Sequence, residues 1–129
     1  MHEKLKPPNN EPAIRLVMLP RDTNAEGTIF GGVILSLIDQ AAYVEAIRQA
    51  HRRFVTVAMD KIVFHQPVFV GDVLSLYAQA VKVGRSSMTI KVGVSARRRL
   101  DPEQTVSVTE AEVVFVALGA DNKPAPIFE

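Results

Sequence analysis

The stretch TIFGGVILSLIDQAAYV, from Thr28 to Val44, decides the fold of this chain, because it predicts one long helix with a single charge, Asp39. Thr28 is a candidate cap for this helix, which we expect to run over residues 30–50. A helix that is apolar on most of its circumference is one that other elements cover. An acid inside it is costly unless it is paired, hydrogen-bonded or neutralised. Asp39 is therefore the first candidate for chemistry, and the Gly31-Gly32 pair is the second.

On both sides of the helix, apolar and polar residues alternate, which is typical of strands. We expect a short strand before the helix at residues 14–19 and four long strands after it, at 54–64, 73–83, 88–96 and 106–118. Tight turns between the later strands imply antiparallel pairing. One helix and one antiparallel sheet predict an α+β domain, in which a curved sheet wraps one long central helix.

Two of the expected strands, 54–64 and 88–96, differ in the regularity of their alternation. In the strand over 54–64, we expect Val55, Val57 and Met59 on one face and Ile62 and Phe64 on the other. This change of face predicts a β-bulge near Asp60-Lys61. The strand over 88–96 alternates without interruption, with inward positions at Met88, Ile90, Val92, Val94 and Ala96.

Length and composition limit the classes of function. The 129 residues fit one domain, which we place at 14–120 between tails at 1–13 and 121–129. We expect the N-terminal tail to be solvated, and it lacks the apolar stretch of a secretion signal. A net charge of +1 argues against a broad nucleic-acid-binding face. The absence of cysteine excludes disulfides and thiolate catalysis, and the three histidines lack metal-ligand spacing. No apolar run is long enough to cross a membrane, so a cytoplasmic location is expected.

Three motifs stand in a characteristic order along the chain: NAEGTIFGG at residues 24–32, LID at 37–39 and PVFVGD at 67–72. Together they resemble the hotdog-fold acyl-CoA thioester hydrolases, in their YciA-like branch, and the resemblance covers about residues 14–118. It implies a hotdog fold and hydrolysis of an acyl-CoA to a free acid and CoA, without a metal or cofactor, since the CoA moiety is part of the substrate. It also implies a homodimer whose two sheets join, often assembled into a hexamer as a trimer of dimers, with no nucleic-acid or membrane partner.

The resemblance also assigns residues to the site. It places the functional asparagine at Asn24, the catalytic acid at Asp39 and the backbone amide that holds the thioester oxygen at Gly32, with Gly31 beside it. The implied CoA contacts are Gly84, Arg85, Ser86 and Ser87. Lys82 and the run Arg97 to Arg99 could also bind the phosphates of CoA, although this run is better interpreted as a solvated strand end.

The residue types suit this chemistry, and each has a structural alternative. Free N–H groups at a helix N-terminus stabilise an oxyanion, and glycine lets a ligand approach them; alternatively, Gly31-Gly32 lets the helix pass close under the sheet. Asp39 can act as a general base or a nucleophile, or it can be a buried acid hydrogen-bonded to a neighbouring strand or to Ser36. Asn24 can position water or the leaving group, or simply form a turn.

Spacing along the helix adds a geometric condition. Asp39 follows Gly32 by seven residues, so the two are about 10 Å apart along the axis of one helix. They cannot both contact one thioester in the same chain. We therefore expect a site between subunits, with Asp39 from one chain and Asn24 and Gly32 from the other.

Other functions remain open at this stage. His65 is a secondary acid/base candidate, although a single histidine at a strand end is more often structural. Its motif, His65-Gln66-Pro67, superficially resembles that of acyl-thioester dehydratases and hydratases of the same fold, but here the long helix precedes it. No serine lies in a Gly-x-Ser-x-Gly motif, which weakens a serine-hydrolase interpretation. A non-catalytic acyl-CoA-binding module is the alternative from a different class.

Overall fold

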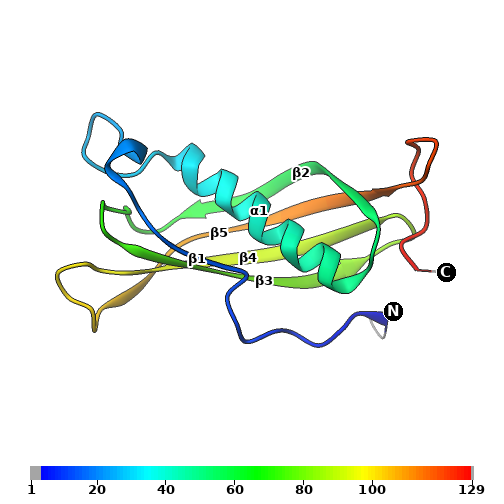
Figure 1. Ribbon diagram of the computed structural model, residues 1–129, viewed down its shortest axis with the longest axis horizontal. Helices are drawn as coiled ribbons and strands as arrows, with labels where there is room; N and C mark the ends of the chain where they lie inside the picture. The colour runs from blue at the N-terminus through cyan, green and yellow to red at the C-terminus, as the bar shows by residue number, and fades with distance from the viewer. Residues whose placement is uncertain (1–3, 129) are drawn as a thin grey trace.

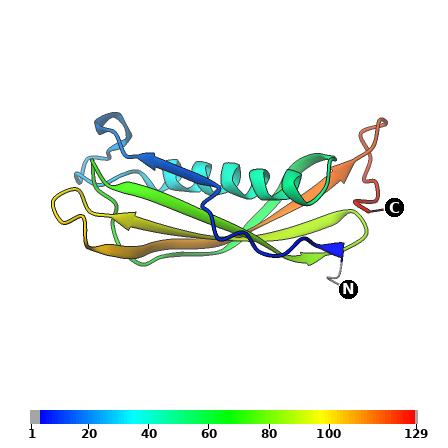
Figure 2. The same ribbon diagram turned by 60° about the horizontal axis from the view of Figure 1, so that its bottom comes forward.

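One long helix lies along one face of a single antiparallel sheet, in a computed structural model that describes residues 4–128 (Figure 1). The elements are β1 (Ile14–Val17), the 3₁₀ turn η2 (Pro20–Asp22), α1 (Gly31–Gln49), β2 (Arg53–Phe64), β3 (Val73–Val83), β4 (Ser87–Arg97) and β5 (Thr105–Leu118). The strand order across the sheet is β1-β3-β4-β5-β2. Figure 2 shows that α1 covers only one face of the twisted sheet. The predicted order of elements and the antiparallel pairing are confirmed.

The core lies between α1 and the middle of the sheet. All five predicted inward side chains of β4 are buried, and they meet a buried face of α1 made of Ile34, Ile38, Ala41, Ala42 and Ala46. Alanine at three of these positions lets the helix approach the sheet closely. On β5, the buried ring of Phe115 makes edge contacts with Tyr43 of α1 and Phe54 of β2, at centroid distances of 6.3 and 6.2 Å.

The start of α1 differs from the expectation. Phe30, not Thr28, is the N-cap residue, and no side chain caps the helix. The Thr28 hydroxyl is instead used within the preceding loop, where it accepts a hydrogen bond from Asn24 Nδ2 at 2.9 Å. The first amides of α1 are therefore left without a side-chain cap.

Strand β2 contains two irregularities, one more than expected. The pairing with β5 shifts between Asp60 and Val63, where Lys61 has φ of 54°, so the predicted bulge is confirmed. A second shift lies between Thr56 and Ala58. Because this extra residue reverses the alternation, Val55 and Met59 face opposite sides of the sheet, and the expectation that they share a face is wrong.

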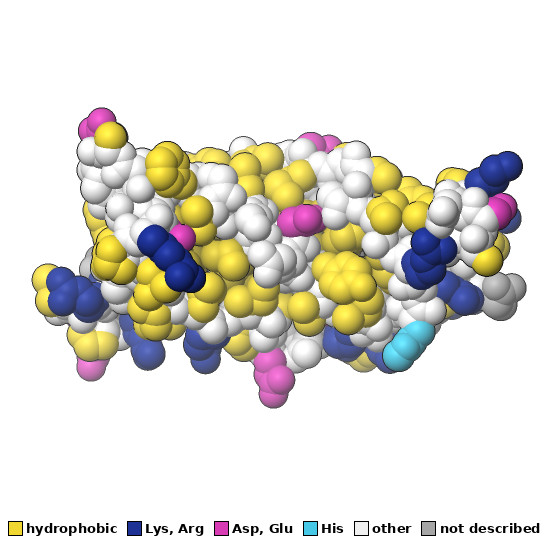
Figure 3. Space-filling view, turned by 45° about the horizontal axis from the view of Figure 1, so that its top comes forward, with side chains coloured by type: hydrophobic (Ala, Val, Ile, Leu, Met, Phe, Trp, Pro, Cys, Tyr) yellow, Lys and Arg dark blue, Asp and Glu magenta, His cyan; other side chains and the backbone are white. Residues whose placement is uncertain are grey.

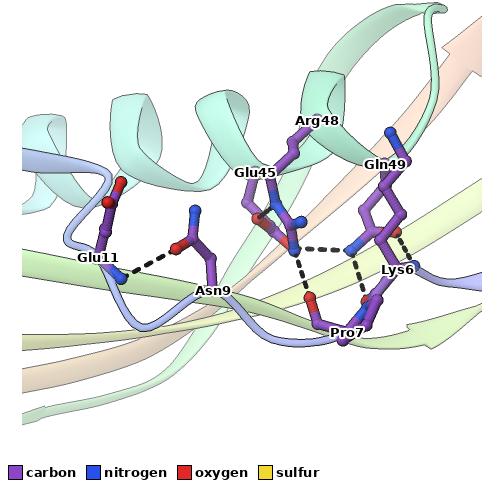
Figure 4. A network of polar contacts seen from close by, with 7 residues as sticks. All are labelled: Lys6, Pro7, Asn9, Glu11, Glu45, Arg48 and Gln49. Carbon is purple, nitrogen blue, oxygen red and sulfur yellow. Dashed lines mark hydrogen bonds and ion pairs between the residues drawn. The ribbon is translucent and has the colours of Figure 1, made fainter.

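The N-terminal segment is exposed but tethered to α1 by hydrogen bonds (Figure 4). Gln49 accepts a hydrogen bond from the Lys6 amide at 2.6 Å and donates to the Lys6 carbonyl, while Arg48 donates to the Pro7 carbonyl at 2.8 Å. Glu45, only 3% exposed, receives hydrogen bonds from both Arg48 and Gln49. The hydrogen bond to Glu45 raises the pKa of the Arg48 guanidinium. The described residues of this segment remain largely exposed, as expected of a solvated tail, but these contacts also attach them to α1.

The loop between β2 and β3 is held by a buried ion pair. Asp72, 2% exposed, accepts hydrogen bonds from the amide of Phe69 at 2.9 Å and from Arg98 at 2.6 Å. Arg98 also donates to the Pro67 carbonyl and stacks over the ring of Phe69. The middle arginine of the run 97–99 thus has a structural role. The adjacent Gly71, at φ of 88°, provides the turn before β3.

Apolar side chains gather on the face formed by α1 and β2 (Figure 3). The exposed ones at the helix start, on α1 and along β2 are Phe30, Tyr43, Val44, Ile47, Val57, Ile62 and Phe64. Val55 and Val63 of β2 are also exposed, but they pair with Val116 and Glu110 on the side of the sheet that α1 does not cover. Because β2 ends the sheet, this α1–β2 surface adjoins a strand edge with unpaired backbone groups. No helix among the described residues has both the length and the apolar character needed to span a membrane.

Candidate active site

Asp39 lies in the middle of α1, at the mouth of a cavity of about 410 Å³ between the helix and β2. Its Oδ1 accepts a hydrogen bond from the Thr56 hydroxyl at 2.7 Å. Its Oδ2 has no partner among residues 4–128. The expected alternative of a bond to a neighbouring strand is thus present, but Asp39 is only half-buried and borders open space. One carboxylate oxygen is held, and the other is available to a ligand.

The cavity beside Asp39 is mostly apolar. Its lining residues are Ile14, Asp39, Gln40, Tyr43, Val44, Phe54, Thr56 and Phe115. Three aromatic rings form much of the wall, and the carboxylate of Asp39 and the Thr56 hydroxyl are at its polar side. Such a space suits an apolar chain that ends in a reactive polar group.

The helix N-terminus forms a second cavity, of about 330 Å³. Gly31 lines it together with residues of the 64–68 segment, and the ring of Phe64 would lie 3.4 Å from a Cβ added to Gly31. Gly32 has open space at the same test position. Within the described part of the chain, neither glycine amide donates a hydrogen bond to a protein acceptor. These free donors at the positive end of the helix dipole are suited to bind an anionic oxygen.

The two cavities have no lining residue in common. The seven residues from Gly32 to Asp39 correspond to about 10 Å along the helix axis. The structure therefore places the acid and the glycine amides on the same helix but does not bring them together in one chain.

Asn24 is the centre of the loop that precedes α1. Its Oδ1 accepts hydrogen bonds from the amides of Glu26 and Thr28, and its Nδ2 donates to the Thr28 hydroxyl. Gly27, at φ of 85°, completes the turn. The side chain thus orders the loop that leads into the glycine pair, and one of its two Nδ2 hydrogens remains unused.

His65 borders the cavity of Gly31, but its ring is engaged elsewhere. Its Nε2 lies 2.7 Å from Glu110 Oε2, and both side chains are about 40% exposed. The residue follows β2 directly, and its amide donates to Val108. The pair explains the position of the ring without a catalytic role.

The expected CoA contacts lie at the opposite end of the molecule from Gly31 and Gly32. Residues 84–86 form the β3–β4 turn and Ser87 begins β4, near the C-terminal end of α1 (Figure 1). The Gly84 amide donates to the Ser87 carbonyl. It is therefore not free to bind a phosphate of CoA, contrary to the expectation. The carbonyls of Arg85 and Ser86 accept from Ile127 and Ala117, which leaves the Arg85 side chain exposed at a fixed turn.

Sequence reasoning missed Thr56 as a contact of Asp39. Thr56 points inward together with Phe54, and the shift between Thr56 and Ala58 changes the alternation only after it. Nothing in the alternation of the strand predicts that shift, so Thr56 was expected on the outward face. The one available signal was the isolated hydroxyl residue within an apolar strand.

Comparisons with known proteins show the family to which the chain belongs. Residues 26–102 match the thioesterase superfamily. An uncharacterised acyl-CoA thioester hydrolase of Zymomonas mobilis is 48% identical over 93% of this chain and 80% of its own length. The acyl-CoA thioester hydrolase YciA of Salmonella typhimurium is 38% identical over 93% of this chain and 92% of its own length.

A solved structure shares the same architecture. A hexameric hotdog-fold thioesterase of Campylobacter jejuni has a TM-score of 0.85 and 43% sequence identity, over 92% of this chain and 91% of that one. The arrangement of one long helix on a five-stranded antiparallel sheet is the hotdog fold. With the sequence relatives, this likeness shows that the chain belongs to the thioesterase superfamily, in the YciA-like branch of hotdog-fold acyl-CoA thioester hydrolases.

Proposed function

We propose that this protein hydrolyses acyl-CoA thioesters to a free carboxylic acid and CoA, at a site that two subunits share. The observation that carries the proposal is the pair of separate half-sites: Asp39 borders one cavity, and Gly31 lines another. Each half lacks what the other supplies, an acid or free oxyanion donors. The YciA relative is an acyl-CoA thioester hydrolase, which supports the same reaction.

A two-fold dimer would supply the missing half. If two β2 edges pair antiparallel, the two sheets join and the two helices run side by side in opposite directions. The N-terminal half of one helix then lies beside the C-terminal half of the other, so that Gly32 approaches the partner subunit's Asp39. The exposed α1–β2 surface would be buried by this contact. The hexamer of the Campylobacter relative supports three such dimers in one assembly.

The chemistry follows from these positions. The Gly32 amide donates to the thioester carbonyl oxygen as that oxygen gains negative charge. The partner subunit's Asp39 takes a proton from the water that attacks the carbonyl carbon, or attacks that carbon itself to give a mixed anhydride that water then hydrolyses to the free acid. Thr56 keeps Oδ1 in place while Oδ2 reacts. The C–S bond breaks, and the sulfur leaves as the CoA thiol. The unused Nδ2 hydrogen of Asn24 would hold the water or the departing sulfur.

The cavity beside Asp39 would take the acyl chain, and the β3–β4 turn would contribute to binding CoA. Of the four residues expected there, Arg85 is the one whose charge is exposed, and it suits a phosphate group. Ser86 and Ser87 add hydroxyl groups beside it. Gly84 contributes turn geometry only, since its amide is already bonded.

The test is a steady-state assay of CoA thiol release over a series of acyl chain lengths. We expect Asp39→Ala and Asn24→Ala each to lower kcat by about 10²–10⁴ without changing oligomer size. Asp101→Asn, on an exposed loop, is the matched control and should retain full activity. Binding of acyl-CoA without turnover by the unmodified protein would instead indicate a non-catalytic module, and full turnover by Asp39→Ala would exclude the acid mechanism.

Subunit mixing tests the shared site directly. Inactive Asp39→Ala and Asn24→Ala chains are mixed under conditions in which subunit exchange is verified by mass. Some mixed dimers then contain one site with both residues intact, so activity should reappear. If exchange is complete and activity stays absent, the proposed sharing of one site between two subunits is excluded.

A further inference from the structure

A small donor-lined cavity lies on the face of the sheet that α1 does not cover. It has a volume of about 210 Å³ and is lined by Arg15, Val73, Ser75, Tyr77, Ser95, Arg97 and Thr105. These residues belong to four neighbouring strands, β1, β3, β4 and β5. The cavity is therefore built on the rigid part of the fold and not on a loop.

The strand register explains why a hollow forms there. Ser75 pairs with Arg15 on one side and with Ser95 on the other, so two small side chains are adjacent at its centre. Arg97 pairs with Val73 and Thr105 one step along the strands. The two arginines thus border a floor of small side chains.

The polar groups of this cavity offer donors in excess. Arg15 donates through Nε to the Ser75 hydroxyl at 2.7 Å and through a terminal nitrogen to the Tyr77 hydroxyl at 3.3 Å. Both acceptors are neutral, and Ser75 is only 7% exposed. Neither hydroxyl proton is donated to another group within residues 4–128, and Arg97 has no side-chain partner there. The cavity therefore presents two guanidinium groups and free hydroxyl donors.

Acids on the same face are engaged elsewhere. Glu112 contacts Lys61 at 3.5 Å and pairs in register with Lys91, and Glu110 is held by His65. Neither arginine of the cavity forms an ion pair in the described part of the chain. Positive charge is thus left uncompensated in this half of the face, in contrast to the balanced charges of the other half.

We propose that this cavity binds the phosphate group of a small molecule. Guanidinium groups suit phosphate oxygens because they donate paired, charge-assisted hydrogen bonds. Arg15 is already held by its hydrogen bonds to Ser75 and Tyr77, so its guanidinium loses little side-chain entropy when a phosphate binds. The cavity is on the sheet face opposite Asp39, so the proposal does not depend on the proposed hydrolysis.

The primary test is calorimetric titration of the intact assembled protein with inorganic phosphate at constant ionic strength. We expect the Kd for phosphate to rise about tenfold or more in Arg97→Gln and in Arg15→Gln, because each loses charge-assisted hydrogen bonds. Lys91→Gln removes the same charge from the same face of β4 and should leave the Kd unchanged. Ser95→Leu fills the hollow while retaining both arginines, and it should also abolish binding.

Several outcomes would overturn the site. They are no phosphate binding by the unmodified protein at millimolar concentration, an equal loss of affinity in Lys91→Gln, and unchanged affinity in Arg97→Gln and Ser95→Leu. A change of oligomer mass in the arginine variants, with phosphate affinity unaffected, would assign the cavity to contact with another protein copy instead. Ser95→Leu keeps the test decisive if loss of Arg15 disturbs folding.

A second arm identifies the source of the phosphate. If Arg97→Gln raises KM for an acyl-CoA but not for the corresponding acyl-pantetheine, which lacks phosphate, the site binds CoA that extends from a neighbouring subunit. If both KM values are unchanged while the Kd for phosphate rises, the ligand is a separate phosphorylated molecule. Either result supports the phosphate site, and the direct titration remains interpretable even if hydrolysis is absent.

Discussion

Gly32 combines two properties that are separable by mutation: an unused backbone amide and open space where a side chain would lie. An added Cβ meets no atom within 4 Å, and the amide donates to no acceptor in the described residues. The position lies in the first turn of α1, where a missing N–H removes no helical hydrogen bond. Substitution here can therefore test a backbone group, which is normally beyond the reach of mutagenesis.

We expect Gly32→Pro to lower kcat by about 10²–10³, the usual effect of losing one oxyanion-hole donor. Proline is tolerated in the first helical turn, and it removes the amide without adding a charge. Gly32→Ala is the matched control, since it adds a methyl group in open space and keeps the N–H. Thermal unfolding of both variants verifies the fold. Equal activity in the two variants would show that the amide does not bind the thioester oxygen.

Among single residues, the sequence identified those that stand out chemically from their neighbours. Asp39 is evident as one acid in an apolar helix, and the Gly31-Gly32 pair is evident at the helix start. Thr56 and the buried Glu45 were not predicted, because their roles come from contacts between elements. Glu45 is 3% exposed on the buried face of α1, where hydrogen bonds from Arg48 and Gln49 satisfy its carboxylate.

At the scale of elements, the pair Asp72–Arg98 joins the β2–β3 loop to the end of β4. Asp72 accepts two hydrogen bonds in a site that is closed to water. The ion pair thereby fixes the loop near the cavity that Gly31 lines, because the loop residues Pro67 and Val68 also line this cavity. The contact connects a structural ion pair with the candidate oxyanion half-site.

Replacing Arg98 by methionine should destabilise the protein by about 3–5 kcal/mol, because the buried Asp72 carboxylate then loses its compensating charge. Urea unfolding at a fixed protein concentration measures this change. Arg21→Met removes a cation from an exposed position and should change the free energy of unfolding by less than about 0.5 kcal/mol. A small effect of Arg98→Met would mean that water or another cation replaces the guanidinium.

Predictability from sequence varied among the elements for a physical reason. β4 follows regular alternation, so its bounds and inward face agree closely with expectation, and β3 has the expected bounds despite a register shift between Ala80 and Lys82. β2 is an edge strand, and its two bulges break the period on which the expected faces depend. The N-terminal segment shows no hydrophobic periodicity. Its hydrogen bonds to Gln49 and Arg48 join residues that are about 40 positions apart in the sequence, so no local pattern predicts them.

At the scale of the whole molecule, the α1–β2 surface is the main unsatisfied feature of the single chain. Half-exposed apolar side chains adjoin a 12-residue edge strand, a combination that favours association with another chain. The separate half-sites favour the same conclusion from a different observation. One contact between subunits would thus satisfy the apolar surface, the strand edge and the incomplete site together.

A charge placed in this surface should therefore abolish both assembly and activity. Val57 is 56% exposed on β2, so Val57→Glu should fold in the monomer but place an unpaired carboxylate in the dimer contact. Burying such a charge costs several kcal/mol, which corresponds to a dimer Kd raised by about two orders of magnitude or more. Thr89→Glu, on the uncovered face of β4, is the control and should remain assembled and active. Mass measurement by light scattering and CoA release are followed over the same range of protein concentration. If the mechanism is shared between subunits, activity returns with the dimer as concentration rises; a fully active Val57→Glu monomer would show that one chain completes the site alone.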